Sequence, residues 1–215
     1  MKKQSAFPYK LYLVISQADC KGQNFLNVAE QAILGGVDAI QLREKNDVMD
    51  VFLRKASQLK EITDKYQIPL IINDNLEVAK KIDATGIHVG TKDVAPAEIR
   101  DQWRKTKYVG YSIEYLEQFE NEQVAISDYL GISPVFKTPT KTDTVTEWGL
   151  DGIRTMRRLT DKPLVAIGNI HLSNVKSVMN AGADCIAVVS AICSAPDPRN
   201  AAYELKNEIL TLLSH

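Results

Sequence analysis

Short apolar runs alternate along the chain with longer segments in which apolar residues recur at helical spacing. The apolar runs have the length and β-branched content of buried strands, and a helical segment follows each one. The strands are expected at Leu11–Ser16, Ala39–Glu44, Leu70–Asp74, Gly86–Gly90, Tyr108–Ser112, Tyr129–Val135, Leu164–Ile170 and Cys185–Ile192. The helices are expected at Asn24–Leu34, Val48–Tyr66, Leu76–Ile82, Ala95–Arg104, Tyr115–Val124, Leu150–Leu159, Ser173–Asn180 and Asn200–Leu213.

This series of strand–helix units predicts a single α/β domain, a (β/α)8 TIM barrel over residues 1–215 with an N-terminal extension at 1–10. Turn residues such as Gly35-Gly36 and Pro69 fall between the units, and no Pro- or Ser-rich linker divides them. A doubly wound open sheet is the alternative, but the first strand lacks its glycine-rich GxGxxG turn. In a barrel, polar residues at the carboxyl ends of the strands line the mouth where ligands bind.

The composition is that of an ordinary globular protein, with 45% hydrophobic and 25% charged residues. The formal net charge is −1, so no global basic field attracts nucleic acid or anionic lipid, and any anion site must be local. Three cysteines without close spacing indicate reduced thiols. The chain has no signal-like segment and no apolar run near roughly 18 residues. We therefore expect a cytoplasmic protein without membrane or nucleic-acid partners, and a homo-oligomer is compatible with the sequence.

The second expected strand ends in three polar side chains that share one face. Gln41, Arg43 and Lys45 alternate with Ile40 and Leu42 in an extended chain, so they point to the same side. An amide, a guanidinium and an ammonium group that converge in this way suit phosphate oxygens. The alternative is a charged strand end that is paired with nearby carboxylates.

Two carboxylates, Asp74 and Asp93, follow the third and fourth expected strands. Magnesium prefers one or two carboxylates completed by water and substrate phosphate oxygens, so this pair is a candidate metal site. The alternative is that Asn73-Asp74 and Asp93 are N-caps of the helices that follow them. His88 is expected to be a hydrogen-bonded core histidine rather than a metal ligand.

Polar residues also follow the later strands. Ser112 ends the fifth strand, and the segment 133–142 after the sixth carries hydroxyl and ammonium donors that could close over a phosphate, or simply form a solvated loop. Gly168 and Ser190 stand after the seventh and eighth strands, where barrels often bind phosphate with backbone N–H groups and a helix N-terminus. Polar groups therefore gather at one end of the predicted barrel.

In their combination and order, these motifs resemble the thiamine-phosphate synthase family from Leu11 to Pro198. The motifs are Gln41-Leu42-Arg43-Glu44-Lys45, Ile72-Asn73-Asp74, His88-Val89-Gly90-Thr91-Lys92-Asp93, Thr138-Pro139-Thr140-Lys141 and Val189-Ser190-Ala191-Ile192. The resemblance implies a magnesium-dependent (β/α)8 transferase. Such an enzyme joins 4-amino-2-methyl-5-hydroxymethylpyrimidine diphosphate to a thiazole phosphate, releases pyrophosphate and makes thiamine phosphate.

The resemblance also assigns roles to individual residues. It implies that the pyrimidine diphosphate is contacted by Gln41, Arg43, Lys45, Asn73, Ser112 and Lys141. Among these, the implied catalytic residues are Arg43, Lys45, Ser112 and Lys141. The implied metal ligands are Asp74 and Asp93. The thiazole phosphate is assigned to Thr138, Thr140, Gly168, Asn169, Val189 and Ser190.

The family mechanism implies a pyrimidine-methyl cation captured by the thiazole nitrogen, and the sequence accordingly shows no activated cysteine or Ser–His pair. The chain departs from the family at two places. It has Ile167-Gly168-Asn169-Ile170 where Ile-Gly-Gly-Ile is usual, and Asn is expected to keep the turn because it tolerates positive φ. It has Ile15-Ser16-Gln17 where Thr-Asp is common. A tautomerase-like relative and a non-catalytic binding barrel are the alternative functions.

Overall fold

The computed structural model describes residues 7–138 and 146–214 and shows a closed barrel of eight parallel strands in the order β1 to β8. The strands are β1 Leu11–Ile15, β2 Ala39–Leu42, β3 Leu70–Asn73, β4 Gly86–Val89, β5 Tyr108–Ile113, β6 Tyr129–Ile132, β7 Leu164–Ile167 and β8 Cys185–Val188. Hydrogen bonds between β1 and β8 close the barrel. The predicted (β/α)8 class is confirmed.

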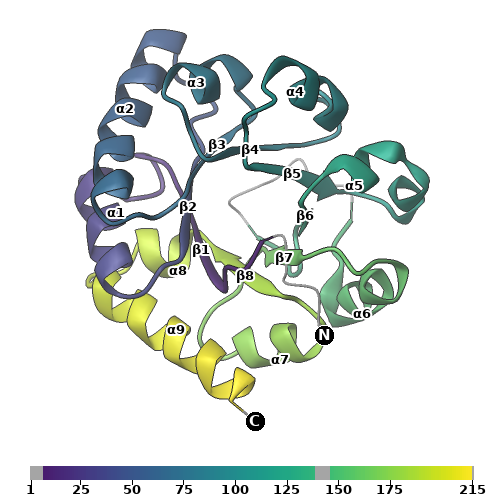
Figure 1. Cartoon of the computed structure of the whole chain (residues 1–215). Coiled ribbons are helices and arrows are strands. Elements are labelled where there is room, and N and C mark those ends of the chain that lie inside the picture. The colour runs from purple at the N-terminus through teal and green to yellow at the C-terminus, as the bar shows by residue number, and fades with distance from the viewer. Residues whose placement is uncertain (1–6, 139–145, 215) are drawn as a thin grey trace.

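Helices surround the barrel on its outside (Figure 1). They are α1 Phe25–Leu34, α2 Met49–Lys65, α3 Leu76–Lys81, α4 Pro96–Gln102, the 3₁₀ helix η1 Leu116–Glu120, α5 Glu122–Ile126, α6 Gly149–Leu159, α7 Val175–Asn180, α8 Ser190–Cys193 and α9 Pro198–Leu213. Within the described ranges, no helix is both long enough and apolar enough to cross a bilayer.

Four predicted elements are wrong in extent by three or more residues or are divided. The strand expected to reach Ile192 ends at Val188, because the backbone leaves the extended conformation at Val189 and its carbonyl accepts from Cys193 N–H to form α8. The helix expected at Tyr115–Val124 is divided into η1 and α5. Its break falls at Asn121, whose side chain accepts from the Gln123 N–H and so competes with the helical ladder.

The sixth strand likewise ends at Ile132 instead of Val135. Pro134 follows within two residues and has no N–H for the ladder. The seventh ends at Ile167 rather than Ile170, because Gly168 turns to a φ of +117°. In both cases the chain leaves the sheet early and forms the rim of the barrel.

Side chains alternate between two apolar layers along every strand. In β1, Leu11, Leu13 and Ile15 pack outward against the helices, whereas Tyr12 and Val14 point into the barrel. At the amino-terminal end the interior is filled by aromatic rings, since Phe7 stacks on Tyr129 with ring centroids 4.2 Å apart. The remaining space therefore lies toward the carboxyl ends of the strands.

Candidate active site

A cavity of about 360 Å³ opens at the carboxyl ends of the strands, a size that suits a small-molecule ligand. Most of the residues singled out from the sequence line it: Gln41, Arg43, Lys45, Asn73, Asp74, Asp93, Ser112, Thr138, Gly168, Asn169, Val189 and Ser190. Thr140 and Lys141 lie outside the described residues. The structure thus brings together candidates that are dispersed over the sequence, and their individual roles stay predictions.

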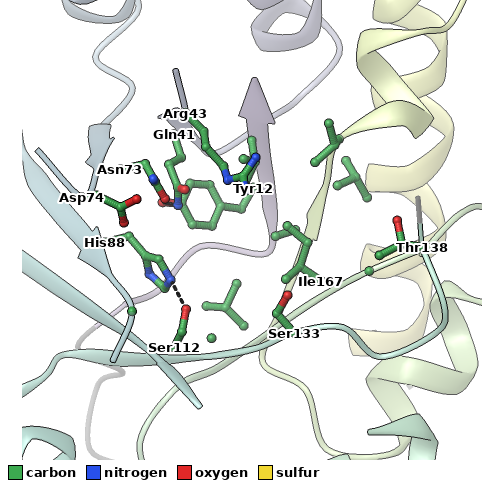
Figure 2. Close-up of a pocket in the computed structure, with 18 of the residues that line it drawn as sticks. Tyr12, Gln41, Arg43, Asn73, Asp74, His88, Ser112, Ser133, Thr138 and Ile167 are labelled. Carbon is green, nitrogen blue, oxygen red and sulfur yellow. Dashed lines mark hydrogen bonds between the residues drawn. The ribbon is translucent and has the colours of Figure 1, made fainter. Parts of the chain in front are cut away.

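The three polar residues of the second strand line the same cavity, as the alternation predicts. Gln41 is buried on the floor, and Arg43 is half-buried in the wall (Figure 2). Glu44 is directed away, to Lys55 at 2.8 Å. Within the described part of the chain no carboxylate forms an ion pair with Arg43, so pairing does not explain its position. A half-buried guanidinium without a counter-ion is well suited to an anionic ligand.

Asp74 and Asp93 lie next to each other at the ends of β3 and β4. Burial, the negative charge of Asp93 and a hydrogen bond with Asp93 raise the pKa of Asp74 to about 7, although Lys45 and Asn73 act in the opposite direction. Asp74 holds a left-handed backbone with a φ of +61°, a strained conformation that is typical of functional positions. When both are ionised, the two carboxylates repel each other, which a bound cation would offset.

Neither aspartate caps a helix, so the capping alternatives are wrong. The N-cap of α3 is Asn75, whose Oδ1 accepts from the Val78 N–H at 2.9 Å. The N-cap of α4 is Ala95, and Asp93 instead accepts from the Gly90 N–H at 2.8 Å, within its own turn. Asp74 makes no such contact with α3, which leaves its carboxylate directed at the cavity (Figure 2).

This pair fits a magnesium ion. Magnesium needs only one or two carboxylates when substrate phosphate and water complete its octahedron. The carboxylate oxygens of Asp74 and Asp93 provide that number, and a divalent cation would relieve their repulsion. No group of three or more His, Cys, Asp or Glu residues suits a metal in the ranges 7–138 and 146–214, so an all-protein cage is not formed there.

The pKa of Asp74 predicts how the metal-free protein responds to pH. Between about pH 4 and pH 7 the folded state binds more protons than the unfolded chain, so this carboxyl lowers the free energy of unfolding as pH rises. Asp74→Asn removes this titration. The free energy of unfolding of the variant minus that of the wild type should therefore be about 1–3 kcal/mol larger at pH 8 than at pH 5, measured by urea unfolding in EDTA. The exposed Asp101→Asn is the matched control and should show no such difference. An Asp74→Asn effect that is equal at both pH values would contradict the raised pKa.

The opposite side of the cavity carries hydroxyl and backbone groups rather than charges. Thr138 and Ile167 lie across from Asp74 and His88 (Figure 2). Gly168 has a φ of +117°, and a Cβ there would lie 2.6 Å from the Cβ of Pro134, so only glycine fits.

Asn169 holds a φ of +51°, which confirms that asparagine keeps this turn. The next strand end adds Ser190, the first residue of α8, where backbone N–H groups have no intrahelical acceptor. Ser16, which replaces the family's usual residue, bonds to Asp19 at 2.6 Å and does not line the cavity. The cavity therefore has one cationic and acidic end and one end of hydroxyl and N–H donors.

The floor of the cavity is not predicted from the sequence. His88 is hydrogen-bonded, as expected, but its Nε2 lies 2.9 Å from Oγ of Ser112, so a Ser–His pair does exist. Sequence spacing does not reveal this pair, because the two residues are 24 positions apart and meet only through the register of β4 and β5. Tyr12 and Tyr129 also line the floor. Their inward positions follow from strand alternation, which is the signal that could have found them.

The fold and this cavity define a (β/α)8 enzyme with a site for phosphate-bearing small molecules. The family model described as thiamine monophosphate synthase matches residues 11–192. The chain is 44% identical over 200 residues to the thiamine-phosphate synthase of Albidiferax ferrireducens, covering 93% of this chain and 91% of the relative. It is 43% identical to that of Leptospira biflexa, covering 92% of this chain and 96% of the relative. Thiamine phosphate pyrophosphorylase from Pyrococcus furiosus superimposes with a TM-score of 0.87 at 29% identity, over 97% of this chain and 98% of that one.

The chain belongs to the thiamine monophosphate synthase family. It is accordingly a transferase of thiamine biosynthesis, and thiamine phosphate synthesis is its activity.

Proposed function

We propose that the cavity condenses 4-amino-2-methyl-5-hydroxymethylpyrimidine diphosphate with a thiazole phosphate and releases pyrophosphate. The observation that carries this assignment is the division of the cavity. Arg43, Lys45 and the Asp74–Asp93 pair occupy one end, and Thr138, Gly168 and Ser190 occupy the other. A diphosphate suits the first end and a monophosphate suits the second.

At the first end, the chain's own residues prepare the diphosphate for departure. Diphosphate leaves only when the charge that develops on it is neutralised. The side chains of Arg43, Lys45 and Lys92 line the cavity and can supply positive charge around its oxygens, with Lys141 of the undescribed segment as a further candidate. Bound magnesium, which Asp74 and Asp93 would hold, supplies Lewis-acid neutralisation of the same charge.

Bond breaking then needs no protein nucleophile. The carbon–oxygen bond of the pyrimidine methylene breaks, its electron pair leaves with pyrophosphate, and the methylene carbon becomes cationic. The thiazole nitrogen supplies its lone pair to form the new carbon–nitrogen bond. The residues of the second end hold the thiazole phosphate so that this nitrogen faces the methylene, which converts the step into an intramolecular one.

The direct test supplies the purified protein with both substrates and Mg²⁺ and measures thiamine phosphate by mass spectrometry. Stoichiometric thiamine phosphate and pyrophosphate are expected. Turnover of the thiazole tautomer without pyrimidine diphosphate would instead identify a tautomerase-like enzyme. Such an enzyme would not require the Asp74–Asp93 pair as metal ligands. Binding of both ligands in calorimetry without pyrophosphate release would identify a non-catalytic barrel.

We further propose that the protein acts in the cytoplasm and that its partners are the pyrimidine diphosphate and the thiazole phosphate. The net charge of −1 gives no field that would draw the protein to nucleic acid or anionic lipid. A homo-oligomer is compatible with this function. Light scattering on the purified protein measures the number of subunits.

A further inference from the structure

Five polar side chains from five strands form an unbroken hydrogen-bonded chain across the floor of the cavity. The amide Nε2 of Gln41 donates to the Tyr12 hydroxyl at 2.9 Å, and that hydroxyl lies 3.2 Å from the hydroxyl of Tyr129. The Tyr129 hydroxyl lies 3.2 Å from Nδ1 of His88. Nε2 of His88 lies 2.9 Å from Oγ of Ser112. The chain thus connects one side of the barrel with the other.

Two protonated phenols and the orientation of the Gln41 amide, whose Nε2 faces Tyr12, together imply one direction for this chain. Tyr12 and Tyr129 are 1% and 0% exposed, and burial raises the pKa of both phenols well above the ordinary range, so both keep their protons. A buried hydroxyl must donate its proton to a partner. Because Tyr12 accepts from Gln41, its proton goes to Tyr129, and the proton of Tyr129 goes to Nδ1 of His88.

The direction decides what His88 and Ser112 can do. A neutral imidazole carries one N–H, so a ring that accepts at Nδ1 carries its proton on Nε2. His88 then donates to Ser112 and cannot take a proton from it. Ser112 therefore keeps its hydroxyl proton as a donor toward the cavity, and the pair is not an activated nucleophile. At the other end, the carbonyl oxygen of Gln41 is left as an acceptor that faces the cavity.

The packing around Tyr129 holds this contact in place. Its ring stacks between Phe7, at 4.2 Å, and His88, at 5.4 Å between centroids. Gly110 makes room for both rings, since a Cβ there would lie 2.2 Å from the Tyr129 ring and 2.4 Å from Nδ1 of His88. The Tyr129 hydroxyl is thus presented to one ring nitrogen of His88 by a tightly packed environment.

We propose that Tyr129 is a positioning residue, which fixes His88 as the Nε2–H tautomer and so sets Ser112 as a hydrogen-bond donor to the pyrimidine diphosphate. The inference rests on the proposed function, because it names what Tyr129 contributes to the binding of that substrate. Tyr129 acts through His88 and does not itself transfer a proton in the reaction.

The tautomer is measured directly in the ligand-free protein by ¹⁵N-labelled histidine NMR at pH 8. The His88 signals are assigned by their loss in His88→Asn. In the wild type we expect a protonated Nε2 and an unprotonated Nδ1. Tyr129→Phe removes only the hydroxyl and should give a mixture of both tautomers. The matched control is Tyr108→Phe, since the Tyr108 hydroxyl bonds to Tyr9 at 3.1 Å and does not join the chain.

Steady-state kinetics supply the second readout. The loss of one organising hydrogen bond should raise the KM for the pyrimidine diphosphate about fivefold in Tyr129→Phe, with the KM for the thiazole phosphate unchanged. Ser112→Ala should raise the same KM while leaving His88 as the Nε2–H tautomer. A merely structural role of Tyr129 would affect both KM values together.

A wild-type His88 with its proton on Nδ1 would overturn the proposal, because the chain would then run in the opposite direction and His88 could act as a base toward Ser112. This measurement requires neither a variant nor turnover. If the tautomer is as expected but no pyrophosphate is released, the proposed function fails and the positioning of His88 stands. If pyrophosphate is released but the proton lies on Nδ1, only the positioning proposal fails.

Discussion

Replacement of Arg43 by alanine is expected to lower kcat/KM for the pyrimidine diphosphate by about 100- to 1,000-fold. The guanidinium is half-buried at the cavity wall and makes no ion pair within the described residues, so its charge is available to the diphosphate. Because charge on the leaving group grows as the carbon–oxygen bond breaks, the loss should appear in kcat as well as in KM. Steady-state rates of thiamine phosphate formation measure it.

The control is Arg54→Ala, which removes an exposed guanidinium on α2. It should retain wild-type kinetics. Arg43→Lys keeps the charge but loses the planar pair of donors, and it should recover only part of the activity. Full activity of Arg43→Ala would contradict the role assigned to this residue.

Asp93→Ala is expected to reduce thiamine phosphate formation by about 100-fold or more at Mg²⁺ concentrations that saturate the wild type. Its carboxylate lines this end of the cavity and lies against that of Asp74. With one acid left, magnesium would be held mainly by the substrate, so the Mg²⁺ concentration for half-maximal rate should rise. A magnesium titration of the initial rate separates this effect from misfolding.

Asp101→Ala removes a carboxylate from the exposed end of α4 and serves as the comparison. Its magnesium titration should coincide with that of the wild type. If Asp93→Ala also coincides with the wild type, the paired acids do not hold the metal.

The barrel could be predicted from the sequence because burial on both faces of a parallel strand leaves a distinct apolar run. The extents of strands were less predictable where the chain turns without a strong signal. Residues 189–192 continue the apolar run of β8, yet Val189 leaves the extended conformation and α8 begins at Ser190. Local propensity does not record this change, since the apolar side chains at 189–192 fit a strand as well as a helix.

The rim of the cavity was predictable for a related reason. Arg43, Asp74 and Asp93 are charged residues at the ends of apolar strands, and such a pattern has few structural explanations. The floor was not predictable in the same way. In the sequence, Tyr129 has the pattern of a buried aromatic residue. Its hydrogen bond with His88 depends on the packing of β4, β5 and β6. Polar contacts between inward-facing side chains require the register of the strands, which no single segment contains.

The most direct test of how the diphosphate departs is to measure pyrophosphate release from the pyrimidine diphosphate, with the thiazole phosphate present, as Mg²⁺ is titrated against EDTA. Release is expected to depend on Mg²⁺, to match thiamine phosphate one to one, and to be lost in both Arg43→Ala and Asp93→Ala. Release at the same rate in EDTA, or in either variant, would contradict the claim that cations at this end of the barrel enable the diphosphate to leave.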